Sequence, residues 1–105
     1  MKPLPKSMEK YKETPKYNEG NTPLAMLNIH NTKENVWGLI VIESGELEYE
    51  IIERSEKYIL TPYEPGVIEP TIKHRIRPLG KVTFHIEFYR SARSTKYTEI
   101  TKVNH

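Results

Sequence analysis

The sequence predicts a single small all-β domain, built as a sandwich or a closed barrel. The chain has 105 residues, a length that one compact domain usually accounts for. Its eight prolines lie so close together that no long stretch keeps a helical periodicity. Short apolar or alternating segments instead follow one another, with turn signals about every eight to twelve residues. This spacing is typical of sandwiches and barrels.

The first half of the chain contains the strongest strand signals. Residues 25–30 form a short apolar run that predicts a strand. Residues 37–43 are apolar at both alternating sets of positions, as in a strand buried on both faces. A tight turn at Ser44-Gly45 is then expected to lead into residues 46–53, which gives a β-hairpin. In this last segment the apolar residues occupy every second position and are predicted to face the core, while the intervening glutamates face water.

The second half predicts shorter strands. Residues 57–60, 67–69 and 72–77 are each predicted as strands. A turn is expected at residues 79–81, before a last strand at residues 82–89.

Three parts of the chain are distinguished by composition. Residues 1–23 are expected to form an N-terminal arm, residues 24–90 the barrel core, and residues 91–105 a polar C-terminal tail. The two end segments are expected to wrap the domain or to extend to a partner. The tail is also the best candidate for a helix.

Composition and missing motifs exclude several classes of function. The net charge is only +2 and basic residues are interleaved with glutamates, so no nucleic-acid partner is predicted. Without cysteine there is no disulfide, thiolate zinc site or cysteine nucleophile. The five glycines form no phosphate-binding or dinucleotide loop, so no nucleotide cofactor is expected. Residues 1–12 lack the apolar region of a signal peptide, and the apolar run 36–42 is too short for a bilayer, so we expect a cytoplasmic protein without membrane contact.

Histidine is the residue type that offers chemistry. His30 ends an early apolar run, and His74 lies on the apolar face of a later strand. His85 and Glu87 share one face of the last strand, opposite its phenylalanine and isoleucine residues, whereas His105 is terminal. An isolated histidine on an apolar face is more often a hydrogen-bonded core residue than a ligand. A barrel would nevertheless allow imidazole and carboxylate groups to meet, and such groups suit zinc, iron, nickel or manganese.

Two stretches carry a family resemblance. The first runs from His30-Asn31-Thr32-Lys33 through residues 36–42 to residues 45–47, and the second combines residues 66–70, 74–76 and 84–89. Together they resemble the small cupin family that includes YeaR-like proteins and the N-terminal domain of some tellurite-resistance methyltransferases (TehB). The resemblance covers residues 8–90.

The resemblance implies a cupin-type double-stranded β-helix, or jelly-roll, barrel with one pocket, and a homodimer. It implies a metal site for one divalent transition metal ion at His30 and His74, with Glu69, His85 or Glu87 as the alternatives for a third ligand. The sequence departs from the general cupin pattern, because Thr32 stands where a second histidine is usual and the usual glutamate position falls near Trp37 and Gly38.

Three functions remain open from the sequence. The first is a binding module that holds a metal ion, an oxyanion or a small organic molecule, as part of a response to tellurite or other toxic anions that the resemblance implies. The second is a small metalloenzyme with a two-histidine site for dioxygen or hydrolytic chemistry. The third is a structural, dimerising protein. Methyl transfer is not expected, because the chain ends before a methyltransferase domain could begin. The predicted pocket residues, besides the histidines, are Lys33, Trp37, Leu39, Tyr49 and Ile76.

Overall fold

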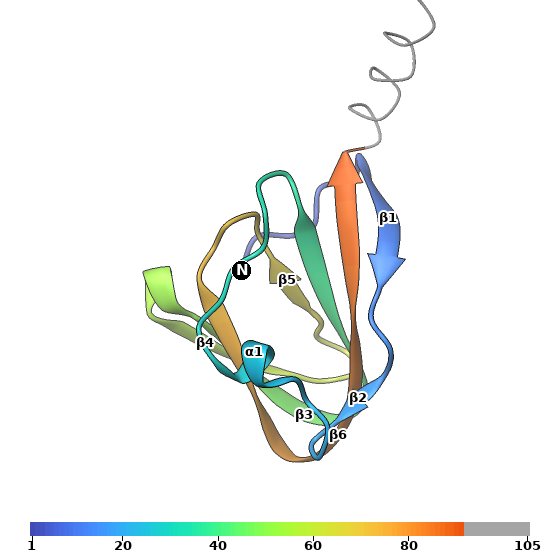
Figure 1. Cartoon of the computed structure of the whole chain (residues 1–105), viewed down its shortest axis with the longest axis vertical. Coiled ribbons are helices and arrows are strands. Elements are labelled where there is room, and N and C mark those ends of the chain that lie inside the picture. The colour runs from blue at the N-terminus through green and yellow to red at the C-terminus, as the bar shows by residue number, and fades with distance from the viewer. Residues whose placement is uncertain (92–105) are drawn as a thin grey trace, which may run out of the picture.

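The structure, a computed structural model, describes residues 1–91 and shows a mostly β domain with one antiparallel six-stranded sheet (Figure 1). The predicted polar tail therefore lies, from residue 92 onward, outside the described residues. The elements in chain order are β1 (Met8–Glu13), β2 (Tyr17–Asn18), α1 (Leu24–Leu27), β3 (Trp37–Ile51), a 3₁₀ turn (Ile52–Arg54), β4 (Glu56–Leu60), β5 (Gly66–Ile68) and β6 (His74–Ser91).

Two long strands, β3 and β6, form the centre of the sheet. β3 pairs with β6 from one end to the other, from Trp37 opposite Tyr89 to Ile51 opposite His74. On the other edge of β6 lie β1 and β2, so part of the segment set apart as an N-terminal arm belongs to the sheet. On the other edge of β3, β5 pairs with its first half and β4 with its second half. Both long strands bend sharply in Figure 1, which brings the two halves of the sheet toward each other.

The predicted hairpin at Ser44-Gly45 and the predicted turn at residues 79–81 are both wrong. Each segment lies inside one continuous strand, where the β3–β6 register shifts as in a β-bulge. Gly45 and Gly80 have φ angles of 83° and 84°. Glycine at positive φ therefore bends the paired strands here without reversing the chain.

The bulge at Gly45 changes which face of β3 points into the core. Before it the even-numbered Ile40 and Ile42 are buried, and after it the odd-numbered Leu47 and Tyr49 are buried. The predicted alternation in residues 46–53 is thus confirmed for its apolar side chains. In the first half of β3 the outer positions are half-buried, so the prediction of burial on both faces is only partly right.

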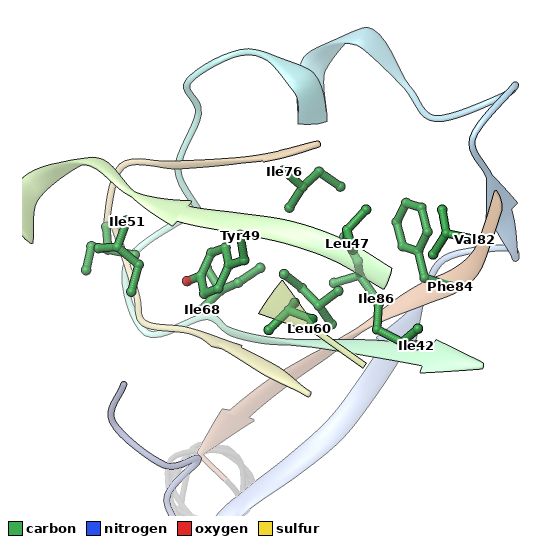
Figure 2. Close-up of a cluster of buried hydrophobic side chains, with 12 residues drawn as sticks. Ile42, Leu47, Tyr49, Ile51, Leu60, Ile68, Ile76, Val82, Phe84 and Ile86 are labelled. Carbon is green, nitrogen blue, oxygen red and sulfur yellow. The ribbon is translucent and has the colours of Figure 1, made fainter. Parts of the chain in front are cut away.

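The core lies between the halves of the bent sheet. Figure 2 shows side chains from β3, β4, β5 and β6 pointing toward one another. Its members are apolar, namely Ile40, Ile42, Leu47, Tyr49, Ile51, Leu60, Ile68, Ile72, Ile76, Val82, Phe84 and Ile86. Burial of such side chains supplies the main favourable free energy of folding. Glu48 is buried on the opposite side of β3, where its carboxylate binds Arg77 at 2.5 Å and Lys57 at 3.5 Å.

The predicted strand at residues 25–30 is also wrong, because α1 begins this segment. Leu24–Leu27 contains leucine, alanine and methionine, which favour helix, and Pro23 precedes its first turn. Among residues 1–91, no helix has the length and apolar content needed to cross a membrane.

Candidate functional site

A backbone bridge brings His30 and His74 together. The His30 N–H donates to the His74 carbonyl, and the His74 N–H donates to the His30 carbonyl, each at 2.9 Å. Directly opposed residues of an antiparallel pair project their side chains on the same side. The two imidazole rings accordingly lie with their centroids 4.2 Å apart and tilted by 54°.

Both rings are held in the same way by their own backbone. His30 Nδ1 lies 2.9 Å from the carbonyl oxygen of Asn28, and His74 Nδ1 lies 2.9 Å from that of Ile72. A carbonyl oxygen only accepts, so each Nδ1 must carry the proton. In the neutral ring this leaves the lone pair on Nε2. A metal-binding histidine typically donates its other N–H to a carbonyl or carboxylate in this manner.

Burial keeps His74 neutral. The residue is 1 % exposed, and its ring packs nearly perpendicular to that of Tyr49, with centroids 5.8 Å apart. Desolvation of the charged form lowers the pKa of His74 to about 4, and the neighbouring His30 lowers it further, against the opposing effect of the Ile72 carbonyl. At neutral pH the ring therefore offers a lone pair and no charge.

The histidine pair lines a cavity of about 320 Å³. Its apolar wall comes from α1, β5, β6 and the segments that flank α1, and includes Met26, Val36, Ile68, Ile86 and Phe88. The polar lining consists of Tyr11, Lys12, His30, Asn31, Thr32, Lys33 and His74. Apolar walls combined with polar groups are the usual make-up of a small-molecule site.

Thr32 fixes the segment that carries His30. Its hydroxyl donates to the Glu69 carbonyl at 3.3 Å and accepts from the Thr71 N–H at 3.2 Å. Thr32, which stands where the general cupin pattern has a histidine, thus links the loop of His30 to the loop of residues 69–71 beside the cavity.

Glu69, one of the three alternatives for a third ligand, is engaged elsewhere. Its carboxylate binds Arg54 at 2.5 Å and Lys2 at 3.8 Å, and its side chain is 14 % exposed. The hydrogen bond from Arg54 holds the pKa of Glu69 below its usual value, despite partial burial. The carboxylate is therefore ionised and paired, and it does not line the cavity.

The other two alternatives, His85 and Glu87, lie on the opposite face of β6 from His74. They alternate with the buried Phe84 and Ile86, as the pattern of the last strand indicates. His85 Nε2 lies 2.9 Å from one carboxylate oxygen of Glu87, and the Tyr89 hydroxyl donates to the other oxygen at 2.7 Å. These residues make a network of their own outside the cavity.

Of the five predicted pocket residues, Lys33 lines the cavity. Trp37 and Leu39 lie on the half-buried outer face of β3, because the inward positions there are Gly38 and Ile40. Tyr49 packs beneath His74 in the core, and its hydroxyl donates to the Val67 carbonyl at 2.9 Å. Ile76 is a core residue that also borders a second, charged groove.

Sequence reasoning missed most of the remaining lining. Lys12 and Tyr11 come from β1, where nearly every residue is exposed and no alternation marks a strand. Phe88 alternates with His85 and Glu87 in the last strand, and this alternation is a usable signal for its inward direction.

The fold and cavity define a small β-rich domain with a paired-histidine pocket. The chain belongs to the TehB-like domain family, whose model matches residues 12–86. This confirms the resemblance drawn from the sequence.

Two solved structures share the fold. TehB from Haemophilus influenzae superposes with a TM-score of 0.74 at 27 % identity, over 82 % of this chain and 32 % of that chain. This chain thus spans about a third of the length of that protein. A protein from E. coli (strain K12) superposes with a TM-score of 0.79 at 18 % identity, over 87 % of this chain and 98 % of that chain. No curated protein sequence matches.

Proposed function

We propose that this chain is a cupin-type binding module, without catalytic activity of its own, whose pocket holds a divalent transition metal ion through Nε2 of His30 and His74. A sheet whose two halves bend around a core, with the histidine-lined cavity beside it, supports the cupin assignment. The resemblance to tellurite-resistance proteins supports a role in resistance to toxic anions. The same resemblance supports a homodimer, which size-exclusion chromatography with light scattering would test.

One observation carries the proposal. Both rings donate Nδ1–H to a carbonyl two residues earlier in the chain, and both line the same cavity. Two histidines stacked only for packing would not need matching tautomers. In neutral rings, matching Nδ1–H tautomers leave a lone pair on each Nε2, and such nitrogens are ligands for zinc, iron, nickel or manganese.

The donor set fits such an ion in part. The two imidazoles supply two ligands, while Glu69, His85 and Glu87 are engaged in the contacts described above. Metal sites with three or four protein ligands are more usual, so positions on the ion would remain for ligands from outside the chain. Bound there, the ion would supply a charge that attracts an oxygen-donor ligand.

Isothermal titration with Zn²⁺ tests the proposal on protein freed of metal by a chelator. We expect binding at micromolar concentration or tighter, and a loss of at least tenfold in affinity for His30→Asn and for His74→Asn. Asparagine suits this test because its amide N–H can replace Nδ1–H while the Nε2 ligand is lost.

The matched control is His85→Asn, which removes an imidazole outside the cavity and should leave zinc affinity unchanged. Circular dichroism would show that each variant is folded. No binding to the unaltered protein, or equal binding by all three variants, would contradict the proposal.

A further inference from the structure

The charged groove that Ile76 borders has a volume of about 560 Å³. It lies on the second half of the sheet, where β3 pairs with β4 and with the first part of β6. α1 lies against β6 (Figure 1), and its Leu27 forms the apolar side of the groove together with Ile76. Among residues 1–91, the groove shares no lining residue with the histidine cavity, so it is a separate concave surface.

The charged side of the groove follows from the strand register. Glu48 is opposite Arg77 on β6. Glu50 is opposite Arg75 on β6 and opposite Lys57 on β4. Residues directly opposite each other on neighbouring strands point to the same side of a sheet. A row of carboxylates on β3 thus lies between guanidinium groups on β6 and an ammonium group on β4.

The carboxylates hold these cations in place. Arg75 donates its Nε–H to Glu50 at 2.8 Å. Arg77 binds one oxygen of Glu48 through Nε at 2.8 Å and Nη2 at 2.5 Å, while Lys57 Nζ lies 3.5 Å from the other oxygen. The hydrogen bond from Arg77 holds the pKa of Glu48 below its usual value, against the opposing effect of burial, so the carboxylate is ionised at neutral pH. Arg77 and Lys57 therefore meet at one carboxylate, from the two sides of β3.

Exposure separates the two signs of charge by depth. The side chains of Glu48 and Glu50 are only 11 % and 20 % exposed. The side chains of Arg75, Lys57 and Arg77 are 47 %, 61 % and 70 % exposed. The carboxylates are the covered partners, and the three cations outnumber them at the surface. A ligand that enters the groove meets positive charge first, which favours an anion.

Part of each guanidinium group remains free to bind such an anion. A guanidinium group has five N–H donors in one plane. Among residues 1–91, Arg75 uses only Nε–H, and Arg77 uses Nε and Nη2. Planar donors of this kind match the oxygens of a phosphate, to which arginine often donates two parallel hydrogen bonds. Because the carboxylates already hold both side chains, less conformational entropy is lost when they bind.

We propose that this groove binds a small organic phosphate, a phosphomonoester, without a metal ion. The phosphate oxygens accept hydrogen bonds from Arg75 and Arg77 and lie close to the ammonium group of Lys57, while the organic part packs against Leu27 and Ile76. A phosphate fits better than a carboxylate, because it offers three oxygens to three cationic groups. The groove volume is within the usual range of ligand pockets. The inference goes beyond the function proposed above and does not depend on a metal ion at the histidine pair.

Phenyl phosphate is the probe. It is titrated into the full chain at neutral pH and low ionic strength, without added metal ions, and followed by calorimetry and by ¹H–¹³C spectra of the arginine Cδ–Hδ groups. We expect saturable binding at millimolar concentration or tighter. The signals of Arg75 and Arg77 should shift, whereas that of Arg90, which lies over the ring of Tyr11 outside the groove, should not.

Variants separate the charged side of the groove from its apolar side. Arg75→Gln removes one guanidinium group and should lower the affinity for phenyl phosphate about tenfold. Arg90→Gln removes the same charge outside the groove and is the matched control, with unchanged affinity. Leu27→Ser should weaken phenyl phosphate but not inorganic phosphate. Circular dichroism would show that each variant is folded, and the spectra of the unaltered protein test the site without any substitution.

Four results would overturn the proposal. The first is no saturable binding of phenyl phosphate, or equal affinity in Arg75→Gln and Arg90→Gln. The second is equal affinity for inorganic phosphate, which would show that the organic part makes no contact. The third is equal affinity for phenylacetate, which would show that a carboxylate suffices. The fourth is a shift at His30 and His74 in place of Arg75 and Arg77, which would locate the probe in the cavity.

Discussion

Replacing Gly45 by alanine tests whether the bend in β3 is a bulge pressed against β6. Gly45 has a φ of 83°, where an L-residue is strained by about 1–2 kcal/mol. A Cβ there would also collide with the carbonyl oxygen of Lys81 and lie 2.9 Å from the Cα of Val82. Both obstacles are backbone atoms of a paired strand, so relief requires β6 to move, at about 1–3 kcal/mol. Alanine also lowers the conformational entropy of the unfolded chain, which offsets a small part of this loss. We therefore expect Gly45→Ala to lower the free energy of unfolding by about 3 kcal/mol.

Gly80→Ala provides the matched comparison. Gly80 has a nearly identical φ of 84°, yet a Cβ on it would meet no atom within 4 Å. Only the backbone strain remains, so we expect a loss of about 1 kcal/mol. Urea unfolding followed by circular dichroism measures both variants. Equal losses for the two glycines would refute the close packing of Gly45 against β6.

Three further predictions concern the neighbourhood of the site. The pKa of His74 is about 4 in the folded protein, whereas an unperturbed histidine, as in the unfolded chain, has a pKa of 6.5. Between these two values the unfolded state binds more protons, so the stability of the folded protein falls as the pH drops below 6.5. Between pH 7.5 and pH 5.5, protonation of His74 in the unfolded state should lower the free energy of unfolding of the metal-free protein by about 1 kcal/mol, measured by urea unfolding. The same pH dependence in the His74→Asn variant would contradict this prediction. Tyr49→Phe leaves the Val67 carbonyl without its 2.9 Å partner and should lower the free energy of unfolding by about 1.5 kcal/mol, whereas an unchanged value would show that the hydrogen bond contributes nothing. Glu69→Gln should leave zinc affinity unchanged in calorimetry, because Arg54 and Lys2 already hold the carboxylate; a tenfold loss would identify Glu69 as a third ligand.

The β class and the core face of residues 46–53 could be predicted because they depend on local alternation. The bulge at Gly45 could not be distinguished from a hairpin turn. Both features need a glycine at positive φ next to a small polar residue, and only the distant pairing with β6 decides between them. The same bulge decides which face of β3 is inside, which is why Trp37 and Leu39 could not be assigned a side from the sequence.

The histidine pair was predictable only with the help of the family resemblance. His30 and His74 meet through a backbone bridge between distant segments, which periodicity does not reveal. Lys12 was beyond reach, because β1 lacks an apolar alternation and is defined by its pairing with β6. The pattern of the last strand did separate His85 and Glu87 from the core face, since Phe84 and Ile86 alternate with them.

The protonation state of the two imidazoles is the most direct test of the central claim. Long-range ¹H–¹⁵N spectra of the metal-free protein at neutral pH distinguish Nδ1–H from Nε2–H rings. We predict Nδ1–H tautomers for His30 and His74, and on addition of Zn²⁺ a shift of their Nε2 resonances while His85 remains unchanged. An Nε2–H tautomer at either residue, or a zinc-induced shift confined to His85, would contradict a metal site at this pair.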